Sequence, residues 1–287
     1  MSDIRNPAQW TADGLGRSGQ AIAAARRVLT RPEADYDAVE PQVRRIGFRD
    51  LGAALREGFD DFAACRSDVL FIGLIYPLSG LVLYNAATRM ELLPLLFPIT
   101  AGFALLGPFL AIGLYEMSRR REAGEEPSFA DATRVFASPS TGAILALGAL
   151  LVAVFALWLA VAWVIYAITL GPDLPTSLPQ FIHEVLHTYE GARLIVLGCS
   201  AGFAFALGVL AASVVSFPLL LDRKVRVRTA VATSLRAFQA SPGPMLAWGL
   251  IVAFGLVLGS LPALLGLIVV MPVLGHATWR LYRRTVV

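Results

Sequence analysis

Apolar residues gather in six long stretches of the chain, and short polar segments separate them. A helix needs about 20 apolar residues at 1.5 Å each to cross the hydrocarbon core of a bilayer, and six stretches qualify. The third and fourth are longer and should tilt or protrude. The six predicted spans are Val69–Ala87, Leu92–Tyr115, Ala143–Leu170, Leu194–Leu221, Met245–Leu261 and Ala263–Tyr282. Pro262 divides the last two, and because proline suits the first turn of a helix, we predict that a new helix begins there.

Arginine and lysine are unevenly distributed among the segments between these spans. They cluster before the first span, after the second, after the fourth and at the C-terminus, whereas the opposite side carries only Arg89 and Arg193. Because cytoplasmic segments carry an excess of Lys and Arg, this asymmetry predicts that both termini are cytoplasmic.

A short cytoplasmic amphipathic segment that ends in phenylalanine precedes each odd-numbered span. Its apolar positions are Phe48, Leu51, Leu55, Phe59 and Phe62 before the first span, Phe129, Ala132 and Phe136 before the third, and Val227, Val231, Leu235 and Phe238 before the fifth. Each even-numbered span carries a proline, at 108, 218 and 272. The pattern predicts one unit used three times, an amphipathic helix and two spans. The amphipathic helix either lies in the interface with its apolar face in the headgroups or packs under the bundle.

The composition supports a membrane protein with a polar N-terminal segment. Hydrophobic residues make up 56% of the 287 residues and charged residues only 16%, whereas soluble domains have about 25% charged residues. Residues 1–45 lack a signal-peptide core, and we predict a mostly disordered cytoplasmic tail there. We therefore expect an all-α fold in which residues 46–287 form a polytopic helical bundle of six transmembrane helices.

Between the third and fourth predicted spans lies the sequence His183-Glu184-Val-Leu-His187, which matches the H-E-x-x-H motif of zinc hydrolases. A catalytic zinc site needs a third protein ligand, and Glu190 is the one acidic candidate close by. The segment is also short, and its apolar residues form one face, as in an interfacial helix. Zinc-dependent hydrolysis is therefore kept only as an alternative.

No other motif in the chain indicates a catalytic, metal-binding or ligand-binding site. The two cysteines, Cys65 and Cys199, fit neither a disulfide framework nor a zinc site. The net charge of +3 comes with no aromatic-interleaved basic patch, so we expect no nucleic-acid partner. We assign no catalytic, cofactor-binding or metal-ligating residue and expect no cofactor. The polar or helix-breaking groups near the cytoplasmic ends of the spans are Tyr76-Pro77, Pro108, Tyr115-Glu116, Pro218, Asp222-Arg223 and His276.

Several stretches resemble a bacterial family of predicted integral membrane proteins that is classed as a domain of unknown function. They include Gly58-Phe-Asp-Asp-Phe62, Leu92-Leu-Pro-Leu-Leu-Phe-Pro98, Gly113-Leu-Tyr-Glu116, Ser213-Val-Val-Ser-Phe-Pro-Leu-Leu-Leu-Asp-Arg223 and Pro272-Val-Leu-Gly-His-Ala-Thr-Trp279. The resemblance covers about residues 43 to 285. Relatives are sometimes labelled cytochrome oxidase subunits, but His276 is the only histidine in a predicted span, which excludes a catalytic haem–copper subunit.

The functional expectation is a non-enzymatic protein of the bacterial inner membrane, acting as an accessory or assembly partner or in envelope homeostasis. The expected partners are the lipid bilayer and other membrane proteins, and the oligomeric state is left open. The repeated hairpins and the span prolines keep a small-solute transporter or channel as the first alternative. A water-accessible cavity lined by Tyr76, Glu116 and His276 would favour it.

Overall fold

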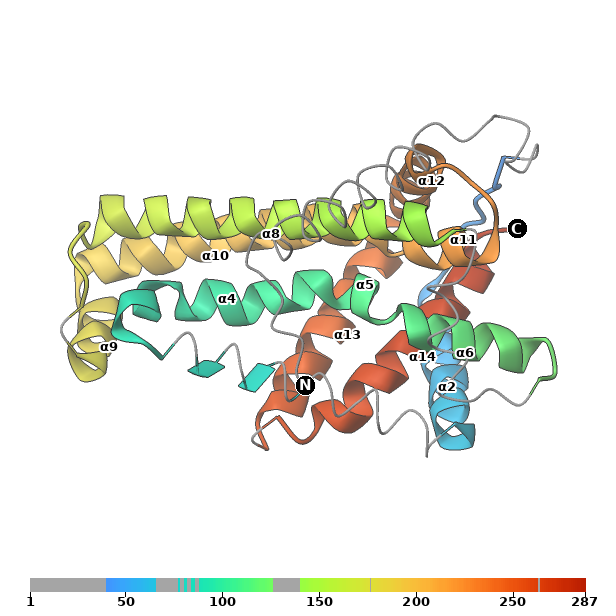
Figure 1. Cartoon of the computed structure of the whole chain (residues 1–287), viewed down its shortest axis with the longest axis horizontal. Coiled ribbons are helices and arrows are strands. Elements are labelled where there is room, and N and C mark those ends of the chain that lie inside the picture. Colours follow the sequence, from blue (N-terminus) through green and yellow to red (C-terminus); the bar gives the residue numbers. More distant parts are fainter. Residues whose placement is uncertain are drawn as a thin grey trace, which may run out of the picture.

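A computed structural model describes residues 40–65, 88–125, 140–175, 177–262 and 264–287, with isolated positions between 77 and 85. These residues form an all-helical structure, as predicted, and the β structure among them is a single bridge between Val43 and Val286. The helices are α2 (Phe48–Ala64), η2 (Met90–Leu95), α4 (Leu96–Phe103), η3 (Ala104–Leu106), α5 (Gly107–Leu110), α6 (Ile112–Glu122), α8 (Thr141–Thr169), α9 (Leu178–His187), α10 (Tyr189–Ser213), α11 (Ser216–Asp222), α12 (Val227–Ala240), α13 (Pro242–Ser260) and α14 (Leu267–Thr285). Figure 1 shows their arrangement.

Four helical segments in the described part of the chain are long and apolar enough to cross a membrane: Leu92–Glu122, Thr141–Thr169, Tyr189–Asp222 and Pro242–Ser260. They correspond to the second, third, fourth and fifth predicted spans. The first predicted span, 69–87, lies almost wholly outside the described residues. The chain is thus a membrane protein with several candidate spans, and the six-span arrangement in three hairpins is not confirmed.

Two of the three predicted span prolines coincide with interruptions of a helix. Pro108 has no N–H to donate to the carbonyl of Ala104, and the turn just before it, η3, is a 3₁₀ helix. Pro218 likewise leaves the carbonyl of Val214 without its helical partner, and α10 ends at Ser213. Pro272, in contrast, lies inside the continuous helix α14. A break in the helix therefore accompanies Pro108 and Pro218 but not Pro272.

The predicted sixth span, 263–282, needs correction. Pro262 lies in a turn, and α14 begins only at Leu267. Leu264 adopts a positive φ of 68° in this turn, and a Cβ at Gly266 would come within 2.8 Å of the backbone of Gly259, so α13 and α14 meet closely. His276 and three arginines lie in the second half of α14, which explains why this helix is not among the candidate spans.

Short helices lie across the two ends of the long ones. In Figure 1, α8 and α10 run side by side along the molecule, α2 and α12 lie crosswise at one end, and α9 lies at the opposite end. The amphipathic segments 48–62 and 227–238 are therefore helices, as predicted, whereas the segment 129–136 falls outside the described residues.

The sequence left open whether the apolar face of these helices lies in the headgroups or packs under the bundle. Helix α2 buries Leu51, Phe62 and three small or polar residues, while Phe48 and Phe59 are exposed. Helix α12 buries only small residues, namely Ala230, Thr233, Ser234 and Ala237. Small side chains let neighbouring helix backbones approach closely, which outweighs the burial of larger apolar side chains here.

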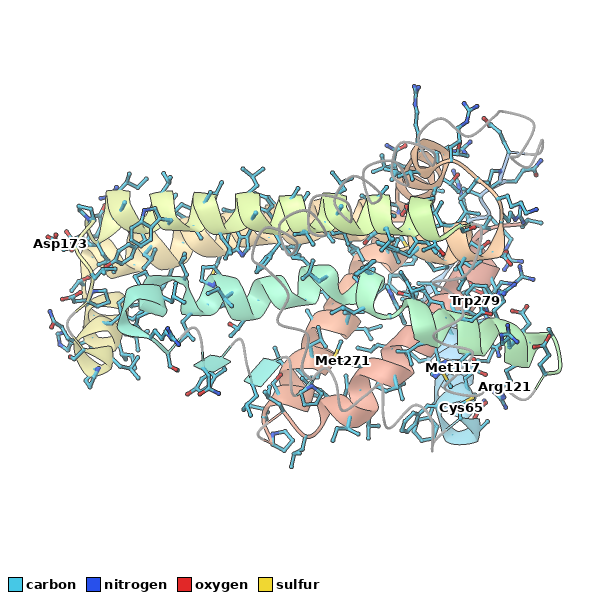
Figure 2. The ribbon with its side chains drawn as sticks, viewed as in Figure 1. Cys65, Met117, Arg121, Asp173, Met271 and Trp279 are labelled. Atoms are coloured by element: carbon cyan, nitrogen blue, oxygen red, sulfur yellow. The ribbon has the colours of Figure 1, made fainter. Side chains whose placement is uncertain are left out.

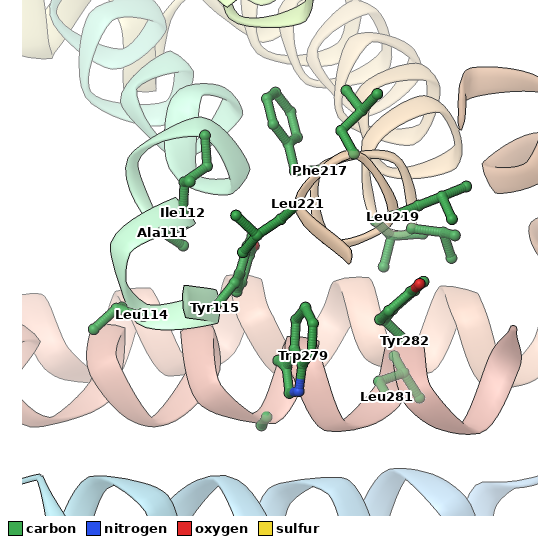
Figure 3. Packing of buried hydrophobic residues seen from close by; sticks show 14 of the residues in the cluster. Ala111, Ile112, Leu114, Tyr115, Phe217, Leu219, Leu221, Trp279, Leu281 and Tyr282 are labelled. Carbon is green, nitrogen blue, oxygen red and sulfur yellow. The ribbon is translucent and has the colours of Figure 1, made fainter. Parts of the chain in front are cut away.

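The most densely buried region is at the end where α2, α6, α11 and α14 meet. The largest fully buried side chains include Trp279, Tyr115, Tyr282 and Phe217, and Figure 3 shows them between these helices. In contrast, many apolar side chains of α8, α10 and α13 face outward. The structure therefore has a well-packed region at one end. Its long helices have apolar outer surfaces, which suit a lipid environment.

Candidate functional site

Helix α14 crosses α2 at unusually short range. A Cβ at Gly58 would lie 2.5 Å from the backbone nitrogen of Ala277, a distance that side-chain carbons essentially never show. Glycine at 58 is therefore what allows the two helices to touch. The close crossing brings the polar residues of α14 against those of α2.

Asp61 of α2 lies at the centre of this contact, and its side chain is 1% exposed. Arg280 of α14 donates to both carboxylate oxygens, from Nε at 2.8 Å and from Nη2 at 2.7 Å. Ser118 Oγ of α6 donates at 2.8 Å, and Arg121 Nη1 donates as well. The carboxylate thus has partners on two helices other than its own, as a buried charge requires.

The network continues from Ser118 to His276, which is completely buried in α14. Ser118 Oγ lies 2.6 Å from His276 Nδ1. The single hydroxyl proton of Ser118 goes to Asp61, so His276 Nδ1 carries a proton and donates to the serine oxygen. His276 Nε2 has no hydrogen-bond partner. We call Asp61, Ser118, Arg121, His276 and Arg280 the polar junction.

Further ion pairs surround the polar junction and tie α14 to three helices. Arg284 binds Glu57 of α2 through both amino groups, at 2.9 and 2.6 Å. Arg283 Nε donates to Glu122 of α6 at 3.0 Å, and Trp279 Nε1 donates to the same carboxylate at 3.0 Å. Tyr282 donates its hydroxyl proton to Asp222 of α11 at 2.6 Å. Figure 2 shows Arg121 and Trp279 at this end of the molecule and Asp173 at the other.

These contacts favour the charged form of two α2 side chains, Glu57 and Asp61. For Glu57, the hydrogen bonds of Arg284 are the main cause that lowers the pKa. For Asp61, burial by itself would raise the pKa, but the hydrogen bonds and the charge of Arg280, helped by Ser118 and Arg121, outweigh it and lower the pKa. Both side chains are therefore carboxylates at neutral pH.

The polar junction does not have the arrangement of a hydrolytic triad. In a triad the histidine stands between the nucleophile and the acid and removes the nucleophile's proton. Here Ser118 stands between His276 and Asp61, and its hydroxyl already donates to the carboxylate. Ser118 is also fully buried. The geometry suits a structural role in which these side chains hold the helices together.

The predicted H-E-x-x-H segment forms helix α9, with Glu184 bound to Gln180 at 2.8 Å. The rings of His183 and His187 stack with their centroids 4.8 Å apart. No group of three or more His, Cys, Asp or Glu side chains that could hold a metal ion occurs within the described ranges. The apolar residues Ile182 and Leu186 are exposed, as expected of an interfacial helix.

The other polar residues named from the sequence lie partly in the polar junction and partly around it. Glu116 is buried and binds Arg119 and Arg120 at 2.8 Å each. Tyr76 lies outside the described residues. A cavity of about 600 Å³ is lined by Glu40, Pro41, Gln42, Val43 and Arg236, and neither Glu116 nor His276 borders it.

Asp61, Ser118 and Arg280 were not singled out as site residues from the sequence. One signal was available for Asp61, since it follows Ala54 and Gly58 at helical spacing on the buried face of α2. A charged residue on such a face needs a buried partner, but the sequence cannot say which one. Ser118 and His276 lie 57 and 158 residues from their partners.

Comparison with known proteins adds one finding. No curated protein and no solved structure matches the chain. The family match extends from α4 to α11 and so includes Ser118 and Arg121 but not the other three residues of the polar junction. Residues 96–222 match the family described as predicted integral membrane protein (DUF2189), which confirms the family of membrane proteins of unknown function that the sequence resembles.

Proposed function

We propose that this chain is a non-enzymatic accessory protein of the bacterial inner membrane, which assembles with other membrane proteins or serves envelope homeostasis. The observation that carries the proposal is the pairing of the polar groups. Asp61, Glu57, Glu116, Glu122 and Asp222 each bind a cation or a hydroxyl of the same chain. Four of these acids bind a group of another helix and so stabilise contacts between helices, whereas Glu116 pairs with arginines of its own helix α6.

The outer surfaces of the long helices support lateral contacts. In the segment Tyr189–Asp222, only 11% of the residues of the most apolar stretch are buried within the molecule. Val196 and Phe203 on α10 are 63% and 60% exposed. Apolar surface of this extent is compatible with lipid and with the helices of a partner protein, since both are apolar.

The proposal includes six membrane crossings with both termini on the cytoplasmic side. The pairing of the two ends of the described chain supports a common side for them, because the N–H of Arg44 donates to the carbonyl of Thr285 at 2.8 Å. The arginines of α6 and α14 lie at this same end, which agrees with the distribution of Lys and Arg in cytoplasmic segments.

Photo-crosslinking in the native membrane tests the accessory role. A crosslinking amino acid replaces Phe203 or Val196, and a matched control replaces Leu147, which is completely buried in α8. We expect discrete protein adducts from the exposed positions and none from Leu147, and the same partner at fixed stoichiometry after purification in mild detergent. A chain that gives only lipid adducts and repeatedly purifies alone contradicts the proposal.

Transport has less support from the structure. Glu116 and His276, which were expected to line a water-accessible cavity in a transporter, are 3% and 0% exposed. Glu116 binds two arginines and His276 binds Ser118. Neither residue is placed to contact a solute in this structure.

A further inference from the structure

Helix α2 exposes two of its three phenylalanines, whereas Phe62 is buried. Phe48 and Phe59 are 66% and 54% exposed. They are eleven residues apart, which places them on the same side of an α-helix, about three turns from each other. Arg49 and Arg56 are exposed on the adjoining side. The outer face of α2, defined by Phe48, Arg49, Arg56 and Phe59, therefore combines aromatic and cationic groups.

Both ends of α2 lie where candidate spans end. At one end, the Phe48 ring is 3.7 Å from the position of a Cβ on Gly243, at the start of α13. At the other end, Asp61 binds Ser118 and Arg121, close to the end of the segment Leu92–Glu122. Figure 1 shows α2 crosswise to α8 and α10. The helix therefore lies along the level at which the spans leave the bilayer.

The charges on α2 are divided between its two sides. Glu57 and Asp61 bind arginines of other helices, and Asp50 accepts from the N–H of Gly47 and lies 3.9 Å from Arg284. Within the described residues, Arg49 and Arg56 have no such ion pair. The fourth acid of α2, Asp60, is exposed beside Arg56. The outer face therefore carries two arginines against one aspartate, and its net charge is positive.

We propose that the outer face of α2 binds the headgroups of anionic phospholipids at the membrane surface. Guanidinium groups form charge-assisted hydrogen bonds with phosphate, and aromatic side chains enter the boundary between headgroups and acyl chains. A lipid is the occupant that fits, because the helix lies at the level of the bilayer surface and its exposed cations complement anionic lipid. This inference does not depend on the proposed accessory role.

Native mass spectrometry of the full chain in detergent tests the proposal, with phosphatidylglycerol and phosphatidylcholine as probes. We expect the unaltered chain to bind phosphatidylglycerol more tightly than phosphatidylcholine. The double variant Arg49→Gln/Arg56→Gln should weaken phosphatidylglycerol binding about thirtyfold, because each arginine near an anionic surface contributes about 1 kcal/mol and about 1.4 kcal/mol corresponds to a tenfold change. The variant Phe59→Ser should weaken binding of both lipids.

The matched control is Arg89→Gln/Arg193→Gln, which removes two exposed arginines from outside α2. It should bind phosphatidylglycerol as the unaltered chain does. Circular dichroism confirms that all variants retain their helix content. Equal affinity of the unaltered chain and the α2 variant for phosphatidylglycerol overturns the proposal, and so does an equal loss in the control variant. Glycerophosphoglycerol without acyl chains should compete poorly, and strong competition by it would overturn the role of the phenylalanines.

Discussion

At the residue scale, Asp61 shows how a charge is kept inside this protein. Its carboxylate accepts hydrogen bonds from Arg280, Ser118 and Arg121 while its side chain is almost inaccessible to solvent. A buried ion pair adds little net stability by itself, because both charges lose their hydration. Removing one partner is costly, however, since the other charge then stays buried without compensation.

We therefore expect Asp61→Asn to lower the free energy of unfolding by about 3 kcal/mol. The neighbouring Asp60 is exposed and serves as the control. Asp60→Asn should change the stability by no more than about 0.5 kcal/mol. Unfolding of the purified chains in mixed detergent micelles, followed by circular dichroism, measures both values. Equal stability of the two variants would show that the polar junction does not hold the helices together.

At the element scale, the contact between α2 and α14 depends on a missing side chain. Gly58→Ala places a carbon 2.5 Å from the backbone of Ala277, so the helices must separate. We expect a loss of about 1–3 kcal/mol, as is usual for overpacked sites. In the same helix, a Cβ on Gly52 meets nothing within 4 Å. Gly52→Ala should stabilise the chain by up to about 1 kcal/mol through helix propensity.

Denaturation midpoints of the two glycine variants, measured in one detergent, decide this prediction. We expect Gly58→Ala to lower the denaturation midpoint and Gly52→Ala to raise it. Destabilisation of the same size at both positions would indicate that the effect comes from helix propensity or insertion and not from the close crossing at Gly58.

Sequence periodicity predicted the elements better than their contacts. The apolar lengths of four spans and the amphipathic repeats of α2 and α12 were sufficient to locate these helices, because both patterns follow from the solvent around each residue. The sequence left the buried faces of α2 and α12 open. Close packing of Gly58 on Ala277 depends on a neighbour 219 residues away in the sequence, which no local pattern encodes.

The start of α14 was missed for a local reason. Proline at 262 predicts the first turn of a helix. The chain instead continues in a turn through Leu264, whose positive φ is uncommon for a residue with a side chain. Tertiary contact between Gly259 and Gly266 accompanies this turn, and the helix begins only after it.

At the scale of the whole molecule, the two ends differ in chemistry. One end holds the polar junction, the arginines of α6 and α14 and the crosswise helices α2 and α12. The other end holds the turn that contains Asp173, together with α9. The proposed orientation, with the arginine-rich end in the cytoplasm, follows from this asymmetry.

Labelling of single cysteines in intact cells tests this orientation most directly. In a chain whose Cys65 and Cys199 are replaced by serine, Asp173→Cys and Ala123→Cys place thiols at exposed positions of the two ends. A membrane-impermeant maleimide should label Asp173→Cys in intact cells and Ala123→Cys only after permeabilisation, with the protein in the membrane fraction. Labelling of Ala123→Cys in intact cells, or a chain that is soluble without detergent, would contradict the account.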